Sequence, residues 1–349
     1  MKAVILQMTK RFDNPADERN FYKTQLEIME KAGFEVKIVL ALGKTDEEMI
    51  AMLKDADVAY CSGNPPITRR VIENCPKLKL IQRTGIGFDS VDIEAATEHG
   101  VLVQTIAGYC IEELAVHSTA LLLSNLRTIT WYDRSMRCGE WAKGQGRLPL
   151  RVSELTLGIL GLGGSGRIMA RIWGQGFGCR LIAYDPYISQ ETAAASGAEL
   201  VDFDTFCRES DLISIHAPLN AETHHIFNAD AFGKMKPTAI IANIARGGFI
   251  DEKALAEALS DGKIAAAGLD TFEKEPMPKD HPLLQMDDRT VLTPHSAYKS
   301  KEASVVQKHL PAMLPVKALC EHTLYRRYVV NPAVLEKLEG YTVLNEVLC

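Results

Sequence analysis

A short glycine-rich segment constrains the fold of this chain more than any other feature of its sequence. Gly161, Gly163 and Gly166 follow the apolar run LTLGIL (155–160) and open a helix-prone segment, SGRIMARIWGQG. In such a strand–turn–helix unit the first glycine permits the tight turn. The second lets the backbone approach a pyrophosphate, and the third allows close packing of helix on strand. The N–H groups at the helix N-terminus then face the phosphates, so the segment predicts a dinucleotide-binding turn.

An acidic residue nineteen positions after the last glycine indicates which dinucleotide is bound. Asp185 follows the next apolar run, RLIAY (180–184), where a carboxylate binds the ribose hydroxyls and repels a 2′-phosphate. The residues after it, Pro186, Tyr187 and Ile188, provide no cation for such a phosphate. The alternative is a glycine-rich turn beside an unrelated surface Asp. With strand, helix and acid all in place, the sequence predicts NAD rather than NADP.

Short apolar runs alternate with helix-prone segments along the whole chain, which predicts βαβ units, parallel sheets and an α/β fold. At 349 residues, two domains are expected. A helix is expected at 111–126, a surface excursion at 137–151, and a C-terminal helical stretch broken by Pro311, Pro315 and Pro332. The runs are 3–7, 36–41, 57–61, 78–82 and 101–105, then six more at 155–160, 180–184, 211–218, 239–245, 265–270 and 290–295. Six strands is the number expected of a full dinucleotide-binding domain.

Composition excludes several classes of protein. The net charge of −6 argues against nucleic-acid binding. The sequence contains no run of eighteen apolar residues, so no membrane span is expected. The N-terminal apolar run is too short for a signal peptide and is expected to be a buried strand. The eight cysteines are irregularly spaced without a C-x-x-C pair, so no metal site is expected. We expect reduced thiols and a cytoplasmic protein.

Three ionisable residues stand at or just after the ends of later strands. Arg246 follows AIIANIA, Glu275 lies just past AAAGLD, and His295 ends TVLTPH. Each alone has an ordinary explanation: a surface cation, a loop acid or a packing residue. Together they suit reduction of a 2-keto acid, which needs a bidentate cation for the carboxylate and a proton donor near neutral pH. A carboxylate beside the imidazole orients it and favours its protonated form.

The chain resembles the D-2-hydroxyacid dehydrogenase family, in the branch that includes phosphoglycerate dehydrogenases. The matching segments are GLGGSG with YDPY, HAPLNAETHHIF, NIARGGFIDEKALAEAL, GLDTFEKEP and LTPHSA, over roughly residues 78–300. The resemblance implies that His295 is the general acid/base, Glu275 its partner, and Arg246 the clamp on the substrate carboxylate.

The resemblance also implies the residues that line NAD and substrate. Asp270 is expected on the nicotinamide side of the cofactor. The loop after LKLIQ is expected to hold the substrate carboxylate, as an anion-binding concavity of backbone N–H groups, although an ordinary tight turn is the alternative. The remaining cofactor residues are Gly161, Gly163, Gly164, Ser165, Gly166, Arg167, Ile168, Asp185, Pro186, His216, Ala217, Pro218, Thr223, Asn243, Ile244, Ala245 and Ala297, and the substrate loop is Arg83, Thr84, Gly85, Ile86 and Gly87.

The family fold implies two doubly wound parallel-sheet domains with a cleft between them. Residues 108–298 would form a Rossmann NAD-binding domain. Residues 1–107 and 299–349 would form a discontinuous, flavodoxin-like substrate domain, and the helix at 111–126 would be one crossover.

Two segments depart from the usual phosphoglycerate dehydrogenase pattern. The loop 61–66, CSGNPP, has no cation where those enzymes usually carry an arginine, and a phosphate would be expected to have more than one basic partner. Tyr298 and Lys299 stand where many relatives have small residues. The substrate is therefore a small 2-hydroxy or 2-keto acid of unspecified identity. About fifty residues follow His295, so the C-terminal regulatory domain that some phosphoglycerate dehydrogenases carry is not expected.

One alternative function and one assembly are also considered. The chain could instead be an NAD(H)-responsive binding protein that resembles the C-terminal-binding corepressors. The segments NLRTITWY and AYDPYISQ are similar to that group. The region 111–151 combines an apolar helix with Trp131, Tyr132 and Trp141, expected to be exposed, which suits an interface between two copies. The family resemblance implies a homodimer. The alternative is that these aromatic residues cover the core of their own chain.

Overall fold

The computed structural model describes residues 1–7, 14–63 and 65–348. The chain divides into two compact units, unit 1 with Met1–Tyr109 and Ser300–Cys349, and unit 2 with Cys110–Lys299. Two positions discussed above, Asn64 of the 61–66 loop and Cys349, lie outside the described residues.

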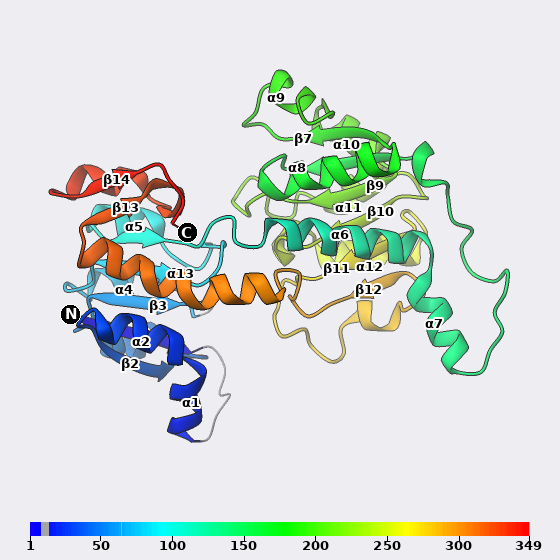
Figure 1. Ribbon diagram of the computed structural model, residues 1–349. Coiled ribbons are helices and arrows are strands. Elements are labelled where there is room, and N and C mark those ends of the chain that lie inside the picture. The colour runs from blue at the N-terminus through cyan, green and yellow to red at the C-terminus, as the bar shows by residue number, and fades with distance from the viewer. Residues whose placement is uncertain (8–13, 64, 349) are drawn as a thin grey trace. The chain divides into compact units, whose positions relative to one another are not determined.

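Unit 1 (Figure 1) is built on a five-stranded parallel sheet of order β2-β1-β3-β4-β5. This is the strand order of flavodoxin-like folds, so the predicted fold of this part is confirmed. Apolar side chains cluster on both faces of this sheet. The strands are β1 Lys2–Gln7, β2 Glu35–Leu40, β3 Val58–Cys61, β4 Leu80–Arg83 and β5 Leu102–Gln104, with a two-stranded ribbon of β13 Thr323–Tyr325 and β14 Thr342–Leu344. The helices are α1 Pro15–Phe21, α2 Lys23–Lys31, α3 Asp46–Leu53, α4 Arg69–Glu73, α5 Ile93–Glu98 and α13 Lys301–Leu319, with short 3-10 turns at Arg326–Tyr328 and Pro332–Lys337.

The long helix α13 continues through two prolines. Pro311 and Pro315 both lie inside it and are buried, so the predicted break at these residues is wrong. Each proline removes one backbone donor. Both rings lie on the helix face that also buries Leu310 and Leu314, and burial of that face outweighs the missing hydrogen bonds. Pro332 lies beyond the helix, at the start of a 3-10 turn.

A row of polar side chains crosses one buried face of the unit 1 sheet. Tyr60, Gln82 and Gln104 stand in register on β3, β4 and β5, and each is at most 2% exposed. Both the nitrogen and the oxygen of the Gln104 amide are buried without a hydrogen-bond partner among the described residues. A buried amide without partners destabilises a fold.

Replacing Gln104 with leucine is therefore expected to stabilise the protein by about 1–3 kcal/mol, because an apolar side chain of similar size removes the desolvation cost. The measurement is the unfolding midpoint by scanning calorimetry. Gln285→Leu, at an exposed position in unit 2, is the control and should change it little. A lower midpoint for Gln104→Leu would mean that the amide is satisfied in the folded protein.

Unit 2 is built on a seven-stranded parallel sheet of order β12-β11-β10-β9-β6-β7-β8. Its first six strands in chain order follow the Rossmann order, which reverses at β6, so the predicted Rossmann fold is confirmed. The strands are β6 Thr156–Leu160, β7 Arg180–Tyr184, β8 Glu199–Leu200, β9 Leu212–Ile215, β10 Ile240–Asn243, β11 Ala266–Leu269 and β12 Thr290–Leu292. The helices are α6 Ile111–Leu126, α7 Ile129–Arg137, α8 Gly164–Ala170, α9 Gln190–Ala194, α10 Phe203–Glu209, α11 Ala229–Lys234 and α12 Glu252–Ser260, with a π-turn at Arg171–Gly176 and 3-10 turns at Val152–Glu154, Gly247–Phe249 and Pro282–Gln285.

The sequence predicts six strands for this sheet and gives no sign of β8. That strand has two residues at the sheet edge, pairs only with β7, and is too short to show a period. The helix predicted at 111–126 is confirmed as α6, which lies along the sheet (Figure 1). A β-carbon on Gly268 of β11 would lie 2.8 Å from the β-carbon of Leu121, so the glycine permits this close packing.

The segment after α7 has no regular structure from Cys138 to Arg151, in agreement with the predicted excursion. Arg147 attaches it to the domain by donating to the carbonyls of Ala265, at 2.6 Å, and Asn125, at 2.5 Å. Trp131 and Tyr132 are half-buried against the same segment, so the expectation that all three aromatics are exposed is wrong for these two. Trp141 is 76% exposed. No helix in the described part of the chain is both long and apolar enough to cross a membrane.

Candidate active site

The glycine turn lies at the point where the strand order of unit 2 reverses. Gly161 follows β6 with a φ of +87°, a conformation that other residues rarely adopt. A β-carbon there would lie 2.8 Å from the backbone nitrogen of Ala217, which follows β9. The loops after β6 and β9 therefore touch, as at the ligand-binding edge of doubly wound sheets.

The other two glycines of the motif have different roles. A β-carbon on Gly166 would lie 2.2 Å from the carbonyl oxygen of Gly161, so only glycine fits at the start of α8. Gly163 has an ordinary φ of −76°, and a β-carbon there would meet no protein atom within 4 Å. Protein packing thus does not require glycine at 163, and the bare backbone leaves room for a ligand. These features fit a dinucleotide pyrophosphate.

A chain of buried polar side chains ties this turn to β9. Ser165 of α8 contacts Nδ1 of His216 at 3.0 Å, and Ser214 contacts Nε2 at 2.7 Å. Ser214 in turn bonds to Ser118 of α6 at 2.6 Å. Burial lowers the pKa of His216 to about 3, so the ring is neutral at physiological pH. His216, predicted to line the cofactor, therefore positions the glycine helix through neutral hydrogen bonds.

Asp185 is held against the same turn. One carboxylate oxygen accepts from the N–H of Leu162 at 2.9 Å, and the other from the N–H of Tyr187 at 3.0 Å. The pairing of β6 with β7 brings these residues together. None of the described lysines or arginines forms an ion pair with Asp185. The carboxylate is thus oriented by backbone donors and keeps its remaining acceptor positions for ribose hydroxyls.

Two further loops carry predicted cofactor residues at the same sheet edge. The Thr223 hydroxyl donates to the Pro218 carbonyl at 3.2 Å, which folds the loop after β9 back on itself. The buried Asn243, at the end of β10, donates to the Arg246 carbonyl at 2.7 Å and accepts from the Ala245 N–H at 3.0 Å. The Asn243 amide thus shapes the turn that presents Arg246.

Arg246 and Glu275 are brought together by Gly247, which is not among the predicted site residues. A β-carbon on Gly247 would lie 1.9 Å from the carbonyl carbon of Phe272, so the backbones of the two loops touch there. The Arg246 guanidinium donates to the Ala245 carbonyl, and its positive charge acts on Glu275. Glycine at 247 is thus a condition for the proximity of these two predicted catalytic residues.

Glu275 and His295 form a hydrogen-bonded pair. Oε2 of Glu275 lies 2.7 Å from Nδ1 of His295, and its Oε1 accepts from the Phe272 N–H at 3.0 Å. Partial burial raises the pKa of Glu275, but His295, the Phe272 N–H and the charge of Arg246 outweigh it and hold the pKa below its ordinary value. The imidazole remains 41% exposed. With Nδ1 turned to the carboxylate, Nε2 is the ring nitrogen left for a reacting group.

A second pair of the same kind lies close by and was missed. His225 Nε2 is 2.5 Å from Oε1 of Glu273, two residues before Glu275. His225 sits in the predicted cofactor segment HAPLNAETHHIF, but no spacing rule in the sequence connects it with Glu273.

The predicted substrate loop of unit 1 is built around a buried arginine. Arg83 is 5% exposed and donates to the carbonyls of Gly87, at 3.0 Å, and Gly63, at 3.2 Å. No carboxylate among the described residues pairs with it. The carbonyl of Thr84 accepts from Gln307 at 3.1 Å. Arg83 therefore supports the shape of two loops, with at least two of its three nitrogens committed to the protein.

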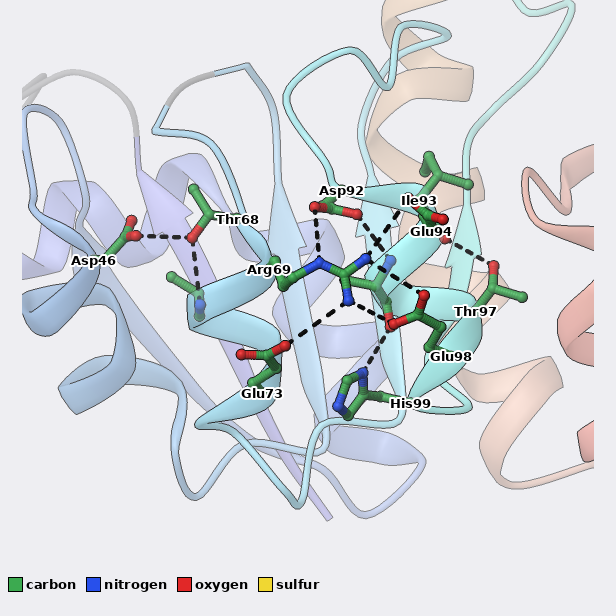
Figure 2. A network of polar contacts seen from close by, with 12 residues as sticks. Asp46, Thr68, Arg69, Glu73, Asp92, Ile93, Glu94, Thr97, Glu98 and His99 are labelled. Atoms are coloured by element: carbon green, nitrogen blue, oxygen red, sulfur yellow. Dashed lines mark hydrogen bonds and ion pairs between the residues drawn. The ribbon is translucent and has the colours of Figure 1, made fainter.

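The far end of this loop is anchored by an arginine and several carboxylates (Figure 2). Asp92 caps α5 and lies 3.9 Å from the Arg69 guanidinium, which also contacts Glu98 at 2.5 Å. The N–H of Asp92 donates to the Ile67 carbonyl at 3.0 Å. Exposed ion pairs are individually weak, but together with this backbone bond they attach the start of α5 to α4.

Asp270 lies fully buried beneath the His295 turn. Its carboxylate accepts from the Thr293 hydroxyl at 2.6 Å and from the N–H groups of Ser296, at 2.8 Å, and Ala297, at 2.9 Å. The structure thus places this predicted nicotinamide-side residue under the turn, where it holds residues 293–297 together.

Comparison with known proteins gives the family. Residues 119–297 match the family model described as the NAD-binding domain of D-isomer-specific 2-hydroxyacid dehydrogenases. The chain is 39% identical over 332 residues to D-3-phosphoglycerate dehydrogenase of Methanocaldococcus jannaschii, covering 94% of this chain and 62% of that protein. It is 38% identical over 257 residues to glyoxylate reductase of Korarchaeum cryptofilum, covering 73% of this chain and 77% of the relative. The chain therefore spans less than two thirds of the phosphoglycerate dehydrogenase.

The solved structure of an NAD-dependent formate dehydrogenase from Staphylococcus aureus, in complex with NAD, matches with a TM-score of 0.82 at 28% identity. The match covers 95% of this chain and 99% of that one. The named relatives are enzymes, so the binding-protein alternative is not favoured. Unit 2 contains an NAD-binding domain, in agreement with the predicted cofactor. The chain belongs to the D-isomer-specific 2-hydroxyacid dehydrogenase family, in its phosphoglycerate dehydrogenase-like branch.

Proposed function

We propose that the protein is an NAD-dependent dehydrogenase that interconverts a D-2-hydroxy acid and its 2-keto acid. The observation that carries the proposal is the Glu275–His295 pair beside Arg246, at the same sheet edge as the glycine turn. NADH, when bound, supplies the hydride that is added to the carbonyl carbon. The residues of this chain must then bind the acid and deliver one proton to the carbonyl oxygen.

The three residues divide these tasks. His295 donates the proton from Nε2, and Glu275, ionised at neutral pH, holds Nδ1 and favours the protonated ring. Arg246 binds the substrate carboxylate through its planar guanidinium. In the oxidative direction the neutral imidazole of His295 accepts the hydroxyl proton.

The cofactor would be held by backbone groups. Gly161 to Ile168 would face the pyrophosphate and Asp185 the adenosine ribose, as the bare backbone at Gly163 supports. Asp270 is fully buried, so it would serve the nicotinamide side through the turn that it holds. Pro186, Ala217, Pro218, Thr223, residues 243–245 and Ala297 would complete the lining.

We propose a small, unphosphorylated substrate such as glyoxylate or a 2-keto acid of two to four carbons. Arg83 is buried and donates to two carbonyls. The loop 61–66 contains no lysine or arginine. A dianionic phosphate would be expected to have several basic partners. The backbone N–H groups of residues 84–87 remain the proposed carboxylate contact in unit 1.

Formate oxidation, the activity named for the structural match, is the second candidate. Formate already lacks a dissociable proton when it gives up hydride to form CO₂, so no acid/base pair is needed. The hydrogen-bonded Glu275–His295 pair therefore favours the 2-hydroxy acid reaction.

The test is NADH oxidation by the purified chain with pyruvate, hydroxypyruvate, glyoxylate, phosphohydroxypyruvate and branched 2-keto acids. We expect the highest kcat/KM with a small unphosphorylated acid. A clear preference for phosphohydroxypyruvate would contradict the substrate proposal, and reduction of none of them would contradict the proposed activity. NAD reduction by formate would support the second candidate.

We also propose that the chain forms homodimers through residues 129–150. Exposed apolar side chains gather there, with Ile129, Met136, Trp141 and Leu148 at 55%, 52%, 76% and 88% exposure. Trp141→Ser with Leu148→Ser is expected to shift the mass in light scattering from dimer to monomer. Leu284→Ser, also exposed but on another segment, is the control. A monomeric wild-type protein would contradict the proposal. We also propose a cytoplasmic location, since no disulfide joins the seven described cysteines.

A further inference from the structure

The buried carboxylate of Asp270 is part of a network that reaches His295. Asp270 is 0% exposed, and a buried charge is stable only when donors surround it. Three such donors come from the segment 293–297, which carries His295 in its centre. The main chain adds a fourth link, because the N–H of His295 donates to the Asp270 carbonyl at 2.7 Å.

These bonds hold an unfavourable backbone conformation. His295 has a φ of +49°, in the left-handed region that non-glycine residues seldom occupy. Without external support, such a residue would relax to another conformation and turn its side chain elsewhere. The 293–297 turn therefore depends on Asp270 for the direction in which the His295 imidazole leaves the backbone.

His117 of α6 extends the network from outside the loop. Its Nε2 lies 2.9 Å from the Thr293 hydroxyl oxygen and 3.6 Å from a carboxylate oxygen of Asp270. The single hydroxyl proton of Thr293 is donated to Asp270, so the hydroxyl must accept from His117. His117 therefore carries a proton on Nε2 and donates it to the Thr293 hydroxyl.

The helix that carries His117 is a rigid support. Leu121 of α6 packs directly on Gly268 of β11. The Thr119 hydroxyl accepts from the indole N–H of Trp173 at 3.1 Å, and Ser118 bonds to Ser214 of β9 at 2.6 Å. His117 is therefore held in place independently of the loop that it contacts.

We propose that His117 is a positioning residue for the acid/base His295, acting through Thr293 and the buried Asp270. The proposal rests on the proposed function for its catalytic consequence, but the structural coupling between His117 and His295 can be tested without turnover. In the sequence, His117 stands between the apolar run Leu114–Val116 and the polar residues Ser118 and Thr119 of α6.

Three variants separate the donated hydrogen bond from packing. His117→Leu removes the donor, Thr293→Val removes the hydroxyl that relays it, and His117→Gln keeps an N–H at similar reach. We expect kcat for keto-acid reduction to fall about ten-fold in the first two, because small displacements of a reacting group are costly. His117→Gln should retain most of the activity, and KM for NADH should change less than about two-fold in all three. The double variant His117→Leu/Thr293→Val should be no worse than either single variant.

A spectroscopic readout tests the coupling directly. In protein labelled with ¹⁵N-histidine, the imidazole signals of His295, assigned by their loss in His295→Asn, should shift in His117→Leu and Thr293→Val. They should stay in place in His117→Gln and in the control Val116→Ala, an exposed position on the same helix. Unchanged His295 signals in His117→Leu and Thr293→Val would overturn the proposal, as would an equal loss of kcat in His117→Gln and His117→Leu. If the wild-type chain reduces no keto acid while the signals shift as expected, the proposed function fails and the coupling stands.

Discussion

Replacing His295 with asparagine is expected to lower kcat for keto-acid reduction by about 10²–10⁴-fold, the usual contribution of a positioned acid/base. The imidazole is the proton donor, and asparagine cannot provide a proton near neutral pH. The Kd of NADH, measured by its fluorescence, should change only a few-fold. The His295 side chain forms no hydrogen bond with the glycine turn or with Asp185, which are proposed to hold the cofactor. Stopped-flow absorbance of NADH measures the hydride step itself.

The matched control for His295→Asn is His225→Asn. His225 also has a positive φ, of +51°, and also pairs with a glutamate of the same loop, Glu273. It should keep kcat within about two-fold of wild type. Equal losses in the two variants would show that any disturbance of this loop stops catalysis, and would remove the assignment of His295 as acid/base.

Replacing Glu275 with glutamine should change the pH dependence as well as the rate. The Glu275 pKa is lowered in the folded protein, so the carboxylate is charged at neutral pH and favours the imidazolium of His295. Without it, the loss of reductase activity at high pH should begin at a lower pH. The rate of hydroxy-acid oxidation, which needs the neutral ring, should conversely persist to lower pH. Profiles of kcat/KM against pH in both directions measure these shifts.

The same pair contributes to stability in a defined pH range. The pKa of Glu275 is lower in the folded than in the unfolded protein. Its contribution to the free energy of unfolding is therefore fully present at pH values above the ordinary glutamate pKa. That contribution is lost as the pH falls through the folded value. The stability difference between wild type and Glu275→Gln should therefore narrow as the solution is acidified.

Replacing Asp185 with asparagine is expected to reduce the preference for NAD over NADP by roughly 10²-fold. A charge of nearly −2 on a 2′-phosphate, placed about 5 Å from a carboxylate, is disfavoured by about 2 kcal/mol at the dielectric constant of water and by more beside the protein. Asparagine keeps an oxygen acceptor for the Leu162 N–H, so the glycine turn should remain in place. The ratio of kcat/KM for the two cofactors, together with their Kd values from calorimetry, measures the effect.

Glu191→Gln, in the neighbouring helix α9, removes the same charge at an exposed position and should leave the cofactor preference unchanged. An undiminished preference in Asp185→Asn would mean that shape, rather than charge, excludes NADP.

Parts of the fold with a clear local pattern were predictable. The eleven predicted strands and the helix α6 carry continuous apolar runs or helical spacing, and each occurs in the structure. The edge strand β8 was missed because two residues show no period. The continuous helix α13 was missed because the buried packing around Pro311 and Pro315 overrides the local preference of proline.

The candidate site likewise has residues that the sequence indicates and contacts that it does not. Arg246, Glu275 and His295 could be named because residue type and position after a strand indicate chemistry, and their catalytic roles stay predictions. The burial of Arg83, the approach of Gly247 to Phe272 and the link from His117 to Asp270 could not be named. Each joins residues 20 to 153 positions apart through contacts that no local spacing encodes.

The sequence by itself therefore determined the class of fold, the dinucleotide turn and NAD as the cofactor, because short-range spacing and the hydrophobic period carry that information. Only the tertiary structure decided which side chains support the site. Asp185 is oriented by the Leu162 N–H across two strands, His216 is neutral because it is buried, and His295 is held in a left-handed turn above Asp270. Burial and hydrogen bonding between distant segments set these properties, and they exist only once the chain has folded.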